Sequence, residues 1–78
     1  MPPSKLATQF GLRVRELRTA RGLSQAALAG AANLHRTHVS LIERAGRVVR
    51  LETVERLAAA LGVEPADLLR PPTGDHRG

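Results

Sequence analysis

The chain contains no cysteine, and this absence limits both its stability and its chemistry. No disulfide can form and no thiolate can hold a metal, which suits a reducing compartment. No apolar run approaches the roughly 20 residues that a membrane span requires, and the first ten residues lack the long apolar stretch of a signal peptide. We therefore expect a cytoplasmic protein without a membrane segment.

The chain is also short, because its 78 residues suffice for only one small domain. A domain of this size buries only about 60% of the surface that its unfolded chain exposes, so its core is marginal. A second subunit would add buried surface, and small domains often depend on such help. Length alone therefore makes a dimer a reasonable expectation.

Acidic residues are scarce in the first fifty positions, where nine Lys or Arg accompany only two Glu, a formal charge of +7. Residues 51–78 hold three Arg and five acidic side chains, a formal charge of −2. A general bias towards arginine could raise the total, but it would not separate the charges along the chain. The separation indicates one face that binds DNA and another face that does not.

Apolar residues recur at helical spacing throughout the chain, and no segment alternates as a strand would. Leu6, Phe10, Val14 and Leu17 follow one another at intervals of four, four and three, which predicts one buried face. In the same helix, Arg13, Arg15 and Arg21 are expected to be solvated or to face DNA. The sequence therefore predicts an all-α domain. Its predicted helices are residues 4–21, 24–32, 36–44, 51–61 and 65–69.

The ends of the chain differ from this central domain, which we place at residues 4–69. Residues 1–3 are expected to be flexible. Residues 70–78 contain no apolar residue that could anchor them apart from two prolines, so we expect a disordered tail.

Residues 23–44, with the sequence LSQAALAGAANLHRTHVSLIER, predict two short helices joined by a tight turn. Ser24 is a good N-cap because its hydroxyl can accept from the free N–H groups of the first turn. Asn33 stands between the helices and tolerates the left-handed conformation that such a turn needs. Val39 and Ile42, three residues apart, would bury one face of the second helix.

This segment resembles the helix-turn-helix of the Xre family, the phage-repressor and Cro-like DNA-binding proteins of bacteria. Its motif is similar to that of restriction–modification controller proteins, and the resemblance runs from about Phe10 to Leu69. The resemblance implies a compact five-helix, lambda-repressor-like domain with the helix-turn-helix in its second and third helices. It also implies a sequence-specific transcriptional regulator that acts as a homodimer on a (pseudo)palindromic operator and controls its own gene. The sequence leaves activation and repression open; activation would need a surface for RNA polymerase, for which the acidic face near Glu52 and Glu55 is the candidate.

The N-terminal part of the third helix would read bases, because in this fold it points into the major groove. Arg36 can bond to O6 and N7 of a guanine, and Thr37 can offer a hydroxyl and a methyl group to a thymine. His38 stands where controller-type relatives often have Tyr, so it is the third candidate. The loop after this helix departs from the family pattern, since Ala45 and Arg50 replace the usual Gly and Ser or Thr.

Contacts with the DNA backbone are expected from polar and basic side chains around the same helix. Gln25 follows a helix N-terminus, where free N–H groups favour a phosphate, and family members reach a phosphate from this position. For each candidate the alternative is an ordinary solvated side chain. The expected phosphate contacts are Gln25, Ser40, Arg44, Arg47 and Arg50.

Two further sets of residues are expected to support the fold and its assembly. The resemblance implies an ion pair between Arg18 and Glu43, and Glu43 is one of only two acids in the first fifty residues. Unpaired, it would repel DNA. Apolar residues that one small domain cannot easily bury predict the dimer interface, which we place at Val48, Val49, Leu51, Leu68 and Leu69.

Other classes of function are less well supported by the sequence. His35 and His38 are three apart but have no third metal ligand nearby, and Ser24 has no base beside it, so we expect no metal, no cofactor and no catalytic residue. An antitoxin that binds its operator and a toxin remains an alternative, although the tail is short for a toxin-neutralising segment. A helical domain that binds only protein is a third possibility, disfavoured by the charge separation.

Overall fold

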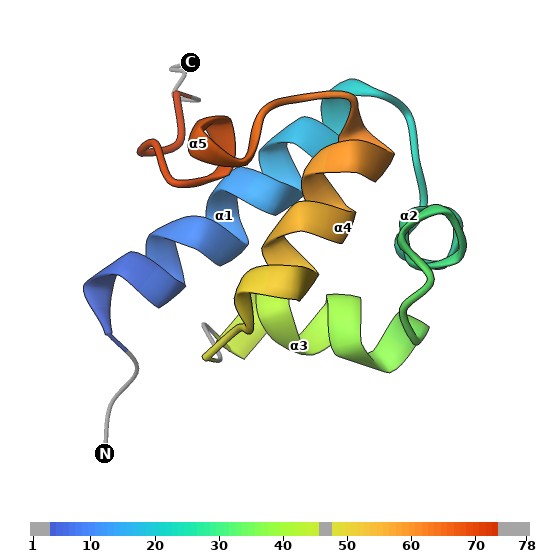
Figure 1. Ribbon diagram of the computed structural model, residues 1–78, viewed down its shortest axis with the longest axis horizontal. Helices are drawn as coiled ribbons and strands as arrows, with labels where there is room; N and C mark the ends of the chain where they lie inside the picture. The colour runs from blue at the N-terminus through green and yellow to red at the C-terminus, as the bar shows by residue number, and fades with distance from the viewer. Residues whose placement is uncertain (1–3, 46–47, 74–78) are drawn as a thin grey trace.

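The computed structural model describes residues 4–45 and 48–73, and the elements within these ranges are all helical (Figure 1). They agree with the five predicted helices to within one residue at each end, which confirms the all-α prediction. None of the described helices is both long enough and apolar enough to span a membrane. The predicted flexible segment, residues 1–3, lies outside the described residues. The helices are α1 Lys5–Ala20, α2 Gln25–Ala32, α3 Arg36–Ala45, α4 Leu51–Leu61 and α5 Pro65–Leu68.

Local capping explains where several helices begin. The hydroxyl of Ser4 accepts from the backbone N–H of Ala7 at 3.0 Å, and Ser24 caps α2 in the same way through Ala27 at 2.9 Å. Arg50 precedes α4 without a capping side-chain bond, as its chemistry predicts. Glu52 in the first turn of α4 partly compensates through the helix dipole.

The core lies where α1, α2 and α3 meet α4 and α5. α1 packs mainly on α3, α2 packs on both α3 and α4, and α5 packs on α4 (Figure 1). Gly11 allows the close crossing of α1 and α3, because a Cβ at this position would overlap the carbonyl oxygen of Ile42. The buried apolar residues are Phe10, Val14, Leu28, Ala29, Ala32, Val39, Ile42, Val54, Leu57, Ala58, Leu61 and Leu68.

Polar contacts fasten the C-terminal part of the chain to α1. The side chain of Gln9 donates to the carbonyl of Leu69 at 3.0 Å, and Nε of Arg13 donates to the carbonyl of Asp67 at 2.9 Å. Thr73 donates its backbone N–H and its hydroxyl to the Glu16 carboxylate, the hydroxyl bond being 2.6 Å. Arg13, expected to be solvated or to face DNA, is therefore a structural residue.

The bond from Thr73 also corrects the prediction of a disordered tail for residues 70–73. That prediction considered only apolar anchors, whereas a carboxylate on α1 supplies a polar anchor. The rest of the predicted tail, residues 74–78, lies outside the described residues.

Candidate nucleic-acid interface

The turn between α2 and α3 sets the angle at which α3 leaves the core. Asn33 has a φ of 56° and a ψ of 46°, which confirms the predicted left-handed conformation. The backbone N–H of Leu34 then donates to the carbonyl of Ala29 at 2.8 Å and closes the end of α2. In Figure 1, α2 is seen nearly end-on while α3 lies across the view, so the two helices cross steeply.

One face of α3 is held in the core while the other is open. Val39 and Ile42 are buried, at 0% and 1% exposure. The opposite face, which we call the recognition face, consists of Arg36, Thr37, Ser40 and Arg44. Of these, Ser40 is half-buried and the others are exposed.

Two histidines flank the start of the recognition face. The backbone N–H of Thr37 donates to the imidazole Nδ1 of His35 at 3.4 Å, so His35, the residue before α3, satisfies one of the free N–H groups of its first turn. His38 lies half-buried in the next turn. The structure thus brings together Arg36, Thr37 and His38, the three candidates for base reading, at the N-terminal end of one exposed helix. Their contacts with bases remain a prediction.

A nearly buried ion pair fixes α3 to α1. Arg18 donates from Nε and Nη2 to the two carboxylate oxygens of Glu43, at 2.7 and 3.0 Å, in a bidentate arrangement. The Glu43 side chain is only 3% exposed, and that of Arg18 is 13% exposed. The predicted pair is thereby confirmed. It also explains how an acid can lie on a positive face without repelling DNA.

The same carboxylate joins the start of α2 to this pair. Gln25 donates from Nε2 to Glu43 at 3.1 Å, and Nη1 of Arg18 donates to the carbonyl of Leu23 at 2.7 Å. These bonds connect α1, α2 and α3 around one buried acid. Gln25 therefore positions α3, and its expected contact with a phosphate remains a prediction.

Beside this network lies a surface hollow of about 410 Å³, which we call the polar groove. It contains three of the expected phosphate contacts, Gln25, Ser40 and Arg44, together with Arg15 of α1. Arg15 was expected only to be solvated or to face DNA, and it was not among the expected phosphate contacts. The signal was its position three residues before Arg18, which places both arginines on one face of α1. The complete lining is Leu12, Arg15, Arg18, Gln25, Ser40, Glu43 and Arg44.

Arg50, another arginine expected at a phosphate, is not among the residues that line this groove. Arg50 is exposed immediately before α4, and Arg47 lies outside the described residues. Arg50 therefore stays a predicted phosphate contact that stands apart from the groove.

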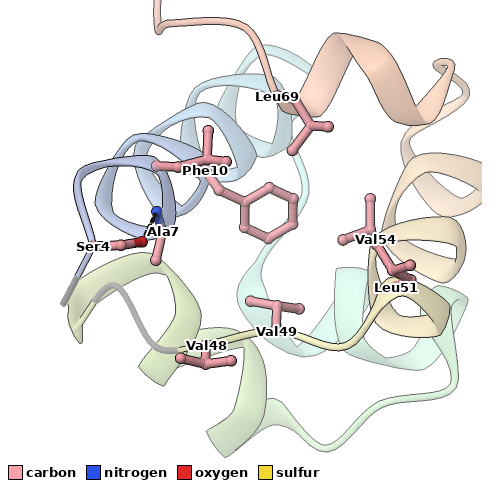
Figure 2. Close-up of a pocket in the computed structure, with 9 residues that line it drawn as sticks. Ser4, Ala7, Phe10, Val48, Val49, Leu51, Val54 and Leu69 are labelled. Carbon is pink, nitrogen blue, oxygen red and sulfur yellow. Dashed lines mark hydrogen bonds between the residues drawn. The ribbon is translucent and has the colours of Figure 1, made fainter.

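A second hollow, of about 290 Å³, lies between the start of α1 and the start of α4, and we call it the apolar groove (Figure 2). Val48 is 91% exposed and Leu51 is 82% exposed, although both are large apolar residues. Leu6 and Leu69 complete this exposed set, at 53% and 46%. The lining residues are Ser4, Leu6, Ala7, Phe10, Val48, Val49, Leu51, Val54 and Leu69.

Four of the five residues expected at the dimer interface line the apolar groove, and their contact with a partner remains a prediction. The fifth, Leu68, is corrected. Leu68 is fully buried in its own core, at 0% exposure, so it has no surface to offer a partner. Adjacent leucines at the end of a short helix point in different directions, and only packing shows which one is internal. Leu6, expected on the buried face of α1, lies instead at the exposed edge of the groove.

Three comparisons with known proteins agree with this geometry. A family model described as a helix-turn-helix domain matches residues 9–70. The control protein C.BamHI of Bacillus amyloliquefaciens is 48% identical over 61 residues, which are 77% of this chain and 75% of that protein.

Two solved structures are similar in both fold and sequence. The restriction–modification controller protein C.AhdI from Aeromonas hydrophila has a TM-score of 0.76 and 48% identity, over 80% of this chain and 94% of that chain. A structure of C.Esp1396I bound to a 25-base-pair operator site has a TM-score of 0.78 and 29% identity, over 83% of this chain and 86% of that chain.

Proposed function

The chain belongs to the family of helix-turn-helix domains, in the Xre-like form found in restriction–modification controller proteins, and we propose that it is a sequence-specific transcriptional regulator. The observation that carries this proposal is the recognition face. Arg36 and Thr37 are exposed at the start of a helix whose other side is fixed in the core, and the acid of that helix, Glu43, is neutralised by Arg18. The matched family is one of DNA-binding regulators rather than of enzymes.

The proposed mechanism separates positioning from reading. Phosphate contacts from Gln25, Ser40 and Arg44 would orient the domain on the duplex without regard to sequence. Arg36 and Thr37 would then meet base edges in the major groove, Arg36 as a bidentate donor to guanine. Because Val39 and Ile42 hold α3 in place, little conformational freedom is lost when the complex forms.

The proposed target is the operator of the protein's own gene, and anisotropy of a labelled duplex tests this choice. Duplex from upstream of that gene is compared with a scrambled duplex at two salt concentrations. We expect a preference of about 10³-fold or more at physiological salt, which Arg36→Ala should abolish. Arg70→Ala, which removes one charge at the end of α5, is the matched control and should keep the preference. Equal binding to both duplexes by the wild-type protein would contradict the proposal.

We further propose that the protein acts as a homodimer whose subunits meet at their apolar grooves. One recognition helix covers only a few base pairs, whereas two-fold dimers read half-sites about 34–36 Å apart. Val48 and Leu51 give the groove a large exposed apolar area, which a second copy of the chain would remove from water.

Leu51→Glu tests this interface without weakening the helix that carries it. Leu51 is the first residue of α4, where a carboxylate is favourable for the helix dipole. We expect sedimentation equilibrium to give a dimer for the wild-type protein and a monomer for the variant. Leu12→Glu, which places the same charge at an exposed leucine outside the apolar groove, should remain dimeric. A wild-type monomer at tens of micromolar would contradict the interface.

The acidic surface of α4 suggests how the protein could regulate transcription. Activation of transcription would need a contact with RNA polymerase, and the exposed acids Glu52 and Glu55 of α4 are the proposed site. A variant with both acids changed to Gln should bind DNA normally but lose activation in a purified transcription assay.

The antitoxin alternative is not favoured, since the similar proteins are controller proteins and transcriptional regulators.

A further inference from the structure

The polar groove contains three arginines, and of these only Arg18 has an ion-pair partner among the described residues. The guanidinium of Arg18 donates hydrogen bonds to the carboxylate of Glu43 and to the carbonyl of Leu23. Arg15 and Arg44 are exposed, and no carboxylate in the described ranges lies within ion-pairing distance of either one. Since the pair of Arg18 and Glu43 is neutral as a unit, the groove keeps two positive charges.

These two charges come from different helices and line the same groove, Arg44 being the C-terminal member of the recognition face. Arg44 lies on α3, two turns after Arg36, with Ser40 halfway between them. Arg15 lies on α1 and lines the same groove. The groove therefore joins α1 to the C-terminal part of the recognition face, and this part would approach the sugar-phosphate backbone if α3 entered the major groove.

The remaining groups that line the groove suit an anion better than an apolar ligand. Ser40 carries a hydroxyl, Gln25 an amide, and the residues after Gln25 in the first turn of α2 are Ala26 and Ala27, which bring no negative charge. Glu43, the one acid of the lining, has both oxygens engaged by Arg18 and one of them also by Gln25.

We propose that the polar groove binds a phosphate of the DNA backbone between Arg15 and Arg44, so that α1 holds the duplex together with α3. This inference rests on the proposed function, and it adds Arg15 to the residues that contact phosphates of the DNA. The contact carries no sequence information. It fixes the rotation of α3 in the major groove through the buried bonds that join α1 to α3.

The first test compares Arg15→Gln with Arg70→Gln by anisotropy over a range of salt concentrations. Each variant removes one charge, but only Arg15 lines the polar groove. We expect Arg15→Gln to reduce the slope of log affinity against log salt by about 0.9 for each protomer, and to weaken binding about tenfold per protomer near 0.1 M salt. Its preference for the native duplex should persist. Arg70→Gln should match the wild type, and Arg15→Lys should keep the slope.

The second test locates the phosphate by coupling. Single phosphates of the duplex are replaced in turn by neutral methylphosphonates, and each modified duplex is titrated with wild-type protein and with Arg15→Gln. At one position in each half-site, we expect the methylphosphonate to lower the affinity of the wild-type protein about tenfold. The same replacement should have little effect on the affinity of Arg15→Gln. Such non-additivity indicates a direct interaction.

The outcomes separate this inference from the proposed function. Equal salt slopes for Arg15→Gln and Arg70→Gln, or additive effects at every phosphate, would overturn the inference while leaving operator binding intact. Equal binding of the wild type to native and scrambled duplex would overturn sequence-specific function, yet the Arg15 slope would still decide the inference. A wild-type protein that bound neither duplex would overturn both.

Discussion

The recognition face and the apolar groove are both exposed, but they are supported in opposite ways. The recognition face is held by a buried polar network, in which Arg18 and Gln25 converge on Glu43. The apolar groove has no such network among its lining residues, and its large side chains, such as Val48 and Leu51, are simply left in water. The recognition face presents polar and basic side chains on a fixed support. The apolar groove is apolar surface that this small domain does not bury by itself.

α1 is the element that the two faces share. Its first turns supply Leu6, Ala7 and Phe10 to the apolar groove, and its middle supplies Arg15 and Arg18 to the polar groove. A change that moves α1 should therefore disturb both faces, whereas a change in the polar network should disturb only one. The three predictions below follow from this difference.

The largest effect is expected from Glu43→Gln, which breaks the network under the recognition face. The Arg18 charge would stay buried without its partner, which costs about 3–5 kcal/mol. For a domain of this size the melting temperature should then fall by at least about 12 °C. Thermal and urea unfolding measure the loss, and DNA affinity should fall with it.

The matched control for this variant is Glu55→Gln on α4, which removes an exposed acid and should leave stability almost unchanged. Self-association of the folded Glu43→Gln protein should persist, because the apolar groove does not depend on the network. A loss of DNA affinity at unchanged stability would disprove the structural role of Glu43.

An intermediate effect is expected from Gly11→Ala, which disturbs both faces through α1. The added methyl group would meet the carbonyl oxygen of Ile42 and push α1 from α3. Overpacking of this kind costs about 1–3 kcal/mol, although alanine recovers about 1 kcal/mol of helix propensity. We expect lower stability in urea, together with weaker DNA binding and weaker self-association.

Gly30→Ala makes the same change in α2, where nothing lies within 4 Å of the added carbon. This control should gain about 1 kcal/mol from helix propensity alone. If both variants were equally stabilised, the close crossing of α1 and α3 would not be the constraint that the structure indicates.

The smallest effect is expected from Asn33→Ala, which acts only at the turn before α3. Alanine would have to adopt the left-handed conformation with φ near 56°, at a cost of about 1 kcal/mol. Asn33→Gly should stay close to the wild type, because glycine adopts this conformation without strain. Urea unfolding compares the stability of the two variants. An equal loss of stability in both would mean that Asn33 stabilises the turn through its side chain rather than through its backbone conformation.

Much of the fold could be predicted because its signals are local. The cap at Ser24, the left-handed turn at Asn33 and the unassisted start of α4 at Arg50 each depend on one residue and its neighbours. The ion pair between Arg18 and Glu43 was predicted from the family resemblance. The scarcity of acids was consistent with it, because Glu43 is one of only two acids beside nine basic residues in the first fifty positions.

The errors concern residues whose environment depends on distant parts of the chain. Leu68 was expected at an interface and is buried, while Leu6 was expected in the core and lines the edge of the apolar groove. Thr73 was expected to be disordered and bonds to Glu16, 57 positions earlier in the chain. Helical periodicity cannot identify such partners, because it shows which residues share a face but not what covers that face.

The sequence by itself determined the five helices, their turns and the separation of charge between the two halves of the chain, since these depend on spacing, capping and composition. Only the tertiary structure decided which side chains share a surface. Arg15 lies in one groove with Ser40 and Arg44, and Leu6 lies in another with Leu69, because the packing of α1 against α3 and α5 brings them together. Contacts between residues so far apart form only when the core closes.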